Sequence, residues 1–421
     1  MARISSVVAR LKRDPIADLP IAAHVDQVLQ DQDITWRDRL LPPLVTLRLF
    51  VTQILHGNCA IPALRQLCGL SFAISSYVEA RGRLPLQLLE SLLQWVNEQA
   101  RETLADVPRL KRRVFIADAS TYSMSDTPEL SAHFDLPPGN QVGVGYPMGK
   151  LLGLIDLATG MFVSLLAVPL FAHEMRDAAE LHPMLRAGDI LVADRAFCTY
   201  VHLAMLQIRG VFACMHLHQL RKDQTPGRQR WLKPRECCDW MDAARYALLP
   251  LFIDVRIVRY TVEHPGFRTR HVLVATTLMD EVLWPDHKIA ELYGHRWNIE
   301  TCFDHLKTTM NMNVLRCKTL AGVMKELAVY LVVYNLVRLA ILKAAARQKV
   351  DAWRISFVDA MRWLAARMIG LSGVDQLIVN PVRPGRCQLR VIRRRLKPYD
   401  LLNRPRRQKE AELAAKKVVI N

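Results

Sequence analysis

The sequence predicts an α/β fold, in which a mixed-sheet domain follows a helical N-terminal region. Apolar residues recur at helical spacing in 44–55 and 86–96, whereas short apolar runs typical of strands begin at residue 113. From 113 to 217 strands and helices alternate, which indicates a sheet covered by helices. Hydrophobic residues make up 51% and charged residues 23% of the 421 residues, a composition that excludes global disorder.

The helical region covers residues 1–110. Within it, 61–69 reads as a short helix that ends at a glycine, and 75–81 reads as a second helix with polar residues outward. Two interpretations fit this pair equally well. The helices could form a helix-turn-helix that reads DNA, or they could simply pack against each other.

The α/β region follows from residue 111 to about 380. We expect strands at 114–120, 151–156, 161–169, 189–194 and 211–217, with helices at 174–185 and 200–208. Residues 219–286 interrupt this alternation with a polar, basic stretch and then a two-stranded β-ribbon, so we interpret them as a β-rich insertion. The chain is again helical over 288–307 and 320–349.

One apolar stretch, 328–342, raises the question of a membrane. It is shorter than the roughly twenty residues that a membrane span needs, and Asn335 and Arg338 interrupt it. We therefore expect a buried core helix and no membrane partner. Residues 1–20 mix charged and apolar groups too closely for a secretory signal. The nine cysteines include no Cys-x-x-Cys pair, so we expect reduced thiols. Reduced thiols and the lack of a secretory signal or membrane span in the sequence predict a cytoplasmic protein.

The charge balance predicts a polyanionic partner. The sequence holds 57 Lys and Arg against 40 Asp and Glu, a formal net charge of +17. Residues 383–409 contain eleven Lys or Arg and one acid, Asp400. We expect this basic C-terminal tail, 381–421, to bind nucleic acid through residues such as Arg393, Arg394 and Arg395, the alternative being a solubilising tail.

The helix 291–307 carries the strongest chemical pattern. At 100° per residue, Tyr293, Arg296, Glu300 and Lys307 fall within an arc of about 60°, next to an apolar stripe. A carboxylate at the margin of a buried stripe, with cations a turn away, suits an acid that holds a metal ion beside phosphate contacts.

Two aspartates, Asp118 and Asp194, complete the pattern. Each ends a short apolar strand, where an unpaired carboxylate is costly to bury. With Glu300 they could hold two hard divalent cations, which clamp the attacking and leaving oxygens of a phosphoryl displacement. The alternative is a structural one, because an Asp at the end of a strand more commonly has a turn or capping role. A zinc site at Cys214, His216 and His218 is a weaker alternative, because its spacing matches no zinc framework.

The four-residue spacing around Glu300 resembles the signature of bacterial insertion-sequence transposases of the insertion-sequence-four family. Asp118-Ala-Ser and Asp194-Arg-Ala-Phe resemble the two aspartate motifs of that family, although many relatives have Gly-Thr after the first aspartate. The resemblance implies a ribonuclease-H-like catalytic domain (111–380) with a β-rich insertion at about 219–286. It implies that Asp118, Asp194 and Glu300 are catalytic and hold two Mg²⁺ ions, with Mn²⁺ as an alternative, and that Tyr293, Arg296 and Lys307 contact DNA.

The same resemblance implies the partners. They are double-stranded DNA, namely terminal inverted repeats and target DNA, and a second copy of the chain in a homodimeric synaptic complex. It also implies cut-and-paste movement through a hairpin intermediate, with a flipped base held by an aromatic residue of the insertion, for which Trp231, Trp240 and Trp284 are candidates. The alternative functions are a catalytically inactive or domesticated DNA-binding protein and a ribonuclease-H-like nuclease or resolvase of another lineage.

Overall fold

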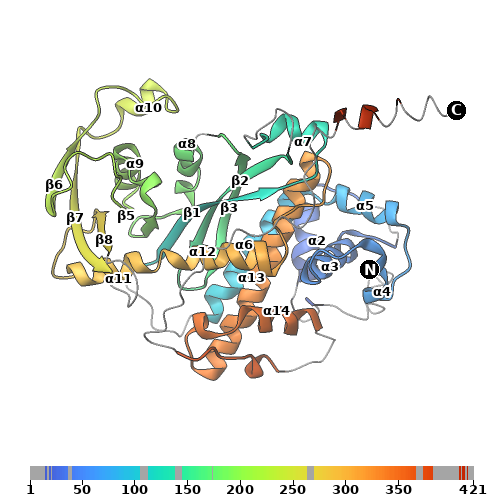
Figure 1. Cartoon of the computed structure of the whole chain (residues 1–421). Coiled ribbons are helices and arrows are strands. Elements are labelled where there is room, and N and C mark those ends of the chain that lie inside the picture. The colour runs from blue at the N-terminus through green and yellow to red at the C-terminus, as the bar shows by residue number, and fades with distance from the viewer. Residues whose placement is uncertain are drawn as a thin grey trace.

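The computed structural model describes residues 15–16, 19, 21–36, 40–104, 112–137, 145–172, 174–262, 270–366 and 373–382, and a few positions between 407 and 415. Its centre is an eight-stranded mixed sheet in the order β3-β2-β1-β4-β5-β8-β7-β6 (Figure 1). The strands are β1 (Val114–Ser123), β2 (Met148–Asp156), β3 (Met161–Pro169), β4 (Ile190–Ala193), β5 (Phe212–His216), β6 (Gly227–Leu232), β7 (Phe252–Val262) and β8 (Arg270–Thr276). The predicted mixed α/β sheet is confirmed.

The direction of pairing changes along the sheet. β1 pairs with β4, and β4 with β5, in parallel, whereas β1–β2–β3 and β5–β8–β7–β6 are antiparallel. The turn between β2 and β3 follows the predicted hairpin, with Gly160 at φ +67°. A Cβ there would lie 2.4 Å from the guanidinium of the buried Arg338, so both the backbone conformation and the space require glycine.

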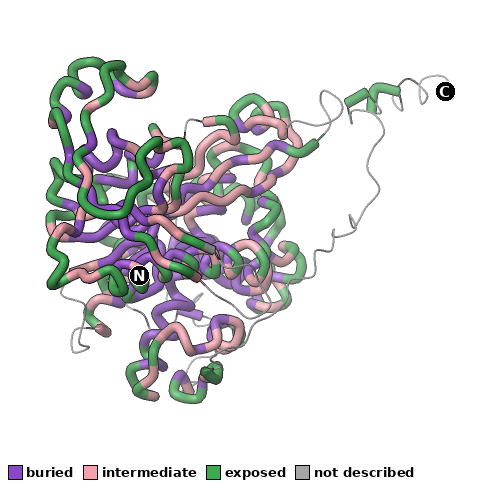
Figure 2. Tube along the Cα trace, turned by 60° about the vertical axis from the view of Figure 1, so that its left-hand side comes forward, coloured by how far each residue is buried: buried purple, intermediate pink, exposed green. Residues whose placement is uncertain are grey.

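Helices cover the two faces of the sheet unequally. On one face lie α8 (Glu174–Ala179) and α9 (Tyr200–Ile208), packed on the apolar side chains of β1, β4 and β5. The larger core lies on the other face. Its helices are α2 (Ile21–Asp31), α3 (Pro43–Leu55), α6 (Leu86–Thr103), α11 (Asp286–Gly294), α12 (Trp297–Asp304), α13 (Leu320–Gln348) and α14 (Phe357–Ala366). In Figure 2 buried segments gather in the interior among intermediate ones, while exposed residues lie mostly at the periphery.

The central element of the larger core is α13, against which α6, α3, α14 and β3 all pack. It is long and apolar enough to cross a membrane, but 89% of its apolar window is buried inside the protein. Asn335 fixes it to β3, because its side chain accepts from the N–H of Phe162 and donates to the carbonyl of the same residue. The predicted buried core helix is confirmed.

The insertion extends the sheet. β8, β7 and β6 continue it from β5 to its outer edge, and a short helix, α10 (Ala243–Ala247), lies between β6 and β7. The sequence predicted two strands here and missed β6. Four of its six residues are exposed and only Trp231 is buried, so β6 shows no apolar alternation to detect.

The N-terminal region also contains the predicted pair of short helices, α4 (Ile61–Cys68) and α5 (Ile74–Arg83). Gly69 follows α4 in the left-handed conformation, at φ +65°. Together with α3 they enclose a small apolar cluster of their own. Most of α5 faces solvent, because Tyr77 and Ala80 are its buried residues.

Candidate active site

Two carboxylates meet at one end of the parallel strands. β1 and β4 are in register up to the pair Ala117–Ala193, and Asp118 and Asp194 are the next residues of the two segments. Asp118 remains in β1, where its Oδ1 accepts a hydrogen bond from the N–H of Ala119 at 2.8 Å. Asp194 precedes a 3₁₀ turn but makes no capping hydrogen bond to it. A capping role therefore does not explain Asp194.

Asp118 is the perturbed acid of the site. Burial raises the pKa of its carboxyl to about 6, and the negative charges of Asp194 and Glu300 add to the shift. The N–H of Ala119 and the guanidinium of Arg296 act in the opposite direction without cancelling it. A group of acids whose ionisation is mutually unfavourable is a place where a bound cation would be strongly stabilised.

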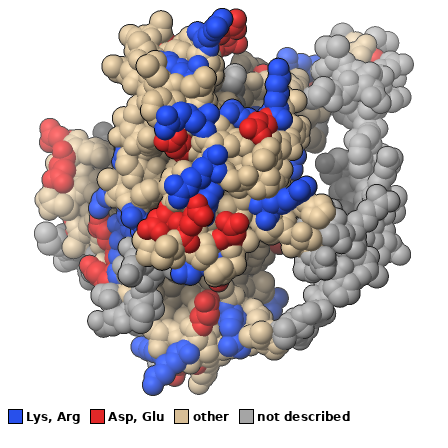
Figure 3. Space-filling model, turned by 90° about the vertical axis from the view of Figure 1, so that its left-hand side faces the viewer, with Lys and Arg blue, Asp and Glu red and all other residues tan. Residues whose placement is uncertain are grey.

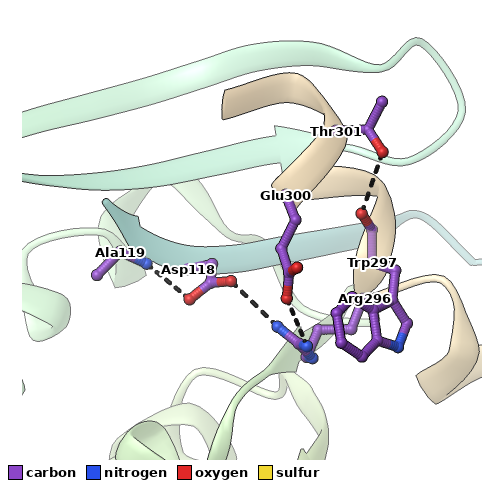
Figure 4. A network of polar contacts seen from close by, with 6 residues as sticks. All are labelled: Asp118, Ala119, Arg296, Trp297, Glu300 and Thr301. Carbon is purple, nitrogen blue, oxygen red and sulfur yellow. Dashed lines mark hydrogen bonds and ion pairs between the residues drawn. The ribbon is translucent and has the colours of Figure 1, made fainter. Parts of the chain in front are cut away.

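Arg296 joins the sheet to the helix that carries Glu300. Its Nη1 lies 3.1 Å from Asp118 Oδ2, and its Nη2 lies 2.7 Å from Glu300 Oε1 (Figure 4). The arginine side chain is 9% exposed, whereas that of Glu300 is 41% exposed. The guanidinium therefore lies between two of the three predicted metal ligands, at the base of an open site.

The donor set fits a hard divalent cation in type, because its three members are carboxylates and the charges of Asp194 and Glu300 act on Asp118. The described residues contain no group of three His, Cys, Asp or Glu side chains that could enclose a metal as they stand. Instead, the guanidinium of Arg296 binds one oxygen of Asp118 and one oxygen of Glu300. A metal ion between these two acids would have to displace it.

The predicted helix over 288–307 is interrupted, which corrects the sequence-based expectation. α11 ends at Gly294, a turn occupies His295 and Arg296, and α12 begins at Trp297. Glycine is a poor helix former, and the ion pairs of Arg296 hold the turn against β1. Tyr293 at the end of α11 is buried, and burial raises its pKa, with Asp194 among the nearby charges that add to the rise. Its predicted DNA contact stays a prediction.

Lys307 reaches the same face of β1 from beyond Glu300. α12 passes into a π-helical turn, His305–Thr309, and there the Nζ of Lys307 donates to Ser120 Oγ at 3.1 Å. Burial lowers the pKa of the half-buried ammonium, while Asp304 opposes the shift. The contact between Ser120 and Lys307 was not predicted from the sequence, although the position of Ser120 two residues after Asp118 puts both side chains on one face of the strand.

The aromatic candidates of the insertion differ in accessibility. Trp231 is 1% exposed and donates to Gln229, and the partly buried Trp240 stacks on His202. Trp284 packs partly buried against the larger core. By contrast, Trp297 is 55% exposed. The Cζ atom of Arg296 lies over its indole, 4.6 Å from the centroid of the ring. The exposed indole nearest to the acids thus comes from α12, outside the insertion.

On the face seen in Figure 3, the basic side chains of the described part of the insertion do not form one continuous surface. Figure 3 shows Lys and Arg interspersed with Asp and Glu over the face that carries β6 to β8. Arg230 and Asp254, for example, form an exposed ion pair at 2.8 Å. The predicted contacts Arg393, Arg394 and Arg395 lie outside the described residues. At the alternative zinc site, Cys214 is fully buried.

Three comparisons bear on this site. A family model described as Transposase DDE domain matches residues 109–336, which is more than half of the chain. The transposase InsG for insertion sequence element IS4 of Escherichia coli (strain K12) is 30% identical over 154 residues. That match spans 32% of this chain and 34% of the relative, so only about a third of the relative is covered.

The third comparison is structural. The cryo-EM structure of the piggyBac transposase synaptic complex with hairpin DNA covers 85% of this chain and 80% of its own at 10% identity. Its TM-score is 0.43, a likeness too distant to establish a common fold.

Proposed function

The chain belongs to the family of transposases with a DDE domain, and on this premise we propose that it cuts and joins DNA at the ends of an insertion sequence. One observation carries the proposal. Asp118 and Asp194, which end neighbouring parallel strands, and Glu300 of α12 lie at one sheet edge, near enough for their charges to raise the pKa of Asp118. We assign the domain 111–380 to the ribonuclease-H-like class on the same basis, with the insertion at about 219–286.

Asp118, Asp194 and Glu300 are the residues that would hold two Mg²⁺ ions. Bound there, the ions would activate the attacking oxygen and stabilise the leaving one. The protein's own part is to fix the acids: β1 and β4 set the spacing of the two aspartates, and Arg296 holds Glu300 toward them in the absence of substrate. If metal ions displaced the guanidinium from the acids, it would become free to bind a phosphate.

DNA would contact the chain in three regions. Tyr293, Arg296 and Lys307 surround the acids and would grip phosphates next to the reacting bond. The helical region 1–110 would act as a DNA-binding domain, for which the largely exposed α5 is the candidate reading helix. The basic tail, 381–421, with Arg393 to Arg395, would add affinity that does not depend on sequence.

The wider activity follows from the family premise. We propose cut-and-paste movement of an element with terminal inverted repeats, performed by a homodimer in the cytoplasm. The buried position of α13 supports a protein that does not span a membrane. Trp297 replaces the insertion tryptophans as our candidate for holding a flipped base, because its indole is exposed beside Arg296.

Isosteric replacement of the acids tests the proposal. Asp118→Asn, Asp194→Asn and Glu300→Gln should each abolish cleavage of an end-containing duplex with Mg²⁺ while gel-shift binding persists, because each removes a metal ligand and keeps the shape of the site. Asp254→Asn, which alters an exposed acid of the insertion, is the matched control and should cleave normally. Cleavage retained in any of the three variants would refute the assignment. A wild-type chain that binds ends but never cleaves would instead establish the alternative, a catalytically inactive DNA-binding relative.

A further inference from the structure

The contact between Lys307 and Ser120 has no place in the metal chemistry. It joins the π-helical turn after α12 to the strand that carries Asp118, at a distance of 3.1 Å. The ammonium is half-buried, and its partner is a neutral hydroxyl. Asp304, the acid whose charge acts on Lys307, accepts a hydrogen bond from Thr308 instead of pairing with the lysine. A cation held in this way keeps its charge available for an anion.

The packing of α12 brings the two residues together. Gly153 of β2 lies opposite Asp118, and a Cβ at this glycine would lie 2.9 Å from the ring of Phe303. The missing side chain lets α12 cross the sheet closely at this point. Ser120 lies one same-face step further along β1, about 6.6 Å from Asp118.

A π-helical turn sets the direction of Lys307. The N–H of Met310 donates to the carbonyl of His305 at 2.8 Å, a bond that spans five residues. The ring of His305 stacks on Phe357 of α14 with centroids 4.1 Å apart, which fixes the widened turn from outside. Single π-turns within helices are frequent at functional sites.

We propose that Ser120 is a positioning residue that fixes the ammonium of Lys307 for a DNA phosphate beside the reacting one. The inference rests on the proposed function. Ser120 lies about 6.6 Å from Asp118 along β1, and successive phosphates of one strand advance 3.4 Å along the duplex axis, so the lysine that Ser120 holds faces a phosphate one or two steps from the reacting one and leaves the reacting phosphate to the acids. An ammonium has three donors: one stays on Ser120, and two remain for phosphate oxygens. Because a free lysine stem has large rotamer entropy, the serine lowers the cost of ordering it on DNA.

Ser120→Ala, Ser120→Thr and the control Thr121→Ala test this role. Thr121 is the next residue of β1, and its side chain faces the other side of the sheet. We expect Ser120→Ala to lower single-turnover cleavage of bound ends by about tenfold, since small misplacements of substrate-gripping groups have effects of this order. Its melting temperature should match that of the wild type. Ser120→Thr, which keeps the hydroxyl, should restore most of the rate, and Thr121→Ala should cleave normally.

Two further measurements separate positioning from a merely structural role. In a Lys307→Ala background, Ser120→Ala should cause no additional loss, because its effect passes through the lysine. In DNA-free protein, acetic anhydride should label Lys307 faster in Ser120→Ala than in the wild type, as quantified by mass spectrometry. The inference would be overturned if Ser120→Ala lowered the cleavage rate as much in the Lys307→Ala background as in the wild type. It would also be overturned if the labelling rate of Lys307 were the same in Ser120→Ala and in the wild type. Absence of cleavage by the wild type, with the labelling difference intact, would refute the proposed function and leave the contact standing.

Discussion

Replacing Arg296 by Gln removes the cation that joins Asp118 to Glu300 and leaves the two acids to repel each other. A hydrogen bond to a charged group contributes about 1.5–3 kcal/mol, and the Asp118 bond has this full value because both side chains are largely buried. The Glu300 bond contributes about 0–1 kcal/mol, since that carboxylate is 41% exposed and screened by water. The expected loss of unfolding free energy without metal is therefore about 1.5–4 kcal/mol, or about 2–5 °C in melting temperature for a chain of this size.

The assay combines melting curves with single-turnover cleavage on one preparation. Arg230→Gln breaks a similar arginine–aspartate pair that is exposed on both sides and screened by water, so it should change the melting temperature little and serves as the control. Mg²⁺ should raise the melting temperature of Arg296→Gln more than that of the wild type, because the ion no longer competes with a guanidinium. Arg296→Lys keeps a charge but cannot bind a phosphate in a bidentate way, so its cleavage should fall markedly. The reasoning would be refuted by equal melting of Arg296→Gln and Arg230→Gln, or by unchanged cleavage per folded Arg296→Lys molecule.

Three other outcomes follow. The pKa of Asp118 is raised to about 6, so this group's contribution to metal-free stability is complete below about pH 4 and is lost as pH rises through 6. Asp118→Asn should lack that decline in unfolding curves from pH 4 to 8, and parallel curves would contradict the pKa assignment. Truncation at Pro381 should flatten the dependence of log DNA affinity on log salt; an unchanged slope would mean that the tail only solubilises. Trp297→Ala should melt like the wild type, because the indole is 55% exposed, but should weaken binding to ends with an unpaired base; equal affinity would exclude stacking.

Those parts of the site that depend on local sequence patterns could be predicted from the sequence. Apolar strands ending in Asp118 and Asp194 were visible as such, and parallel pairing then places the two residues side by side. The spacing around Glu300 was specific enough to indicate the family, which the match over residues 109–336 confirms.

The features that the sequence did not reveal depend on tertiary contacts. The break at His295 and Arg296 interrupts a sequence with unbroken helical periodicity, and it is held by ion pairs to a strand far away in the chain. The π-turn after α12 depends in the same way on Phe357 of α14. Exposure of Trp297 could not be predicted either, since an indole beside an apolar stripe fits a core as well as a surface.

The burial of α13 has a consequence for how the chain is made. α6 packs its apolar face against α13, yet α6 ends at Thr103 and α13 ends at Gln348. A ribosome adds about 5–20 residues per second, so the roughly 245 residues between these ends take about 10–50 s. Until α13 is complete, the nascent helices and, once it has been made, the hairpin β2–β3 expose surfaces whose partner has not yet been synthesised. Prolonged exposure of this kind creates a need for chaperones during translation, and nascent chains that stop before α13 should be removed by proteases.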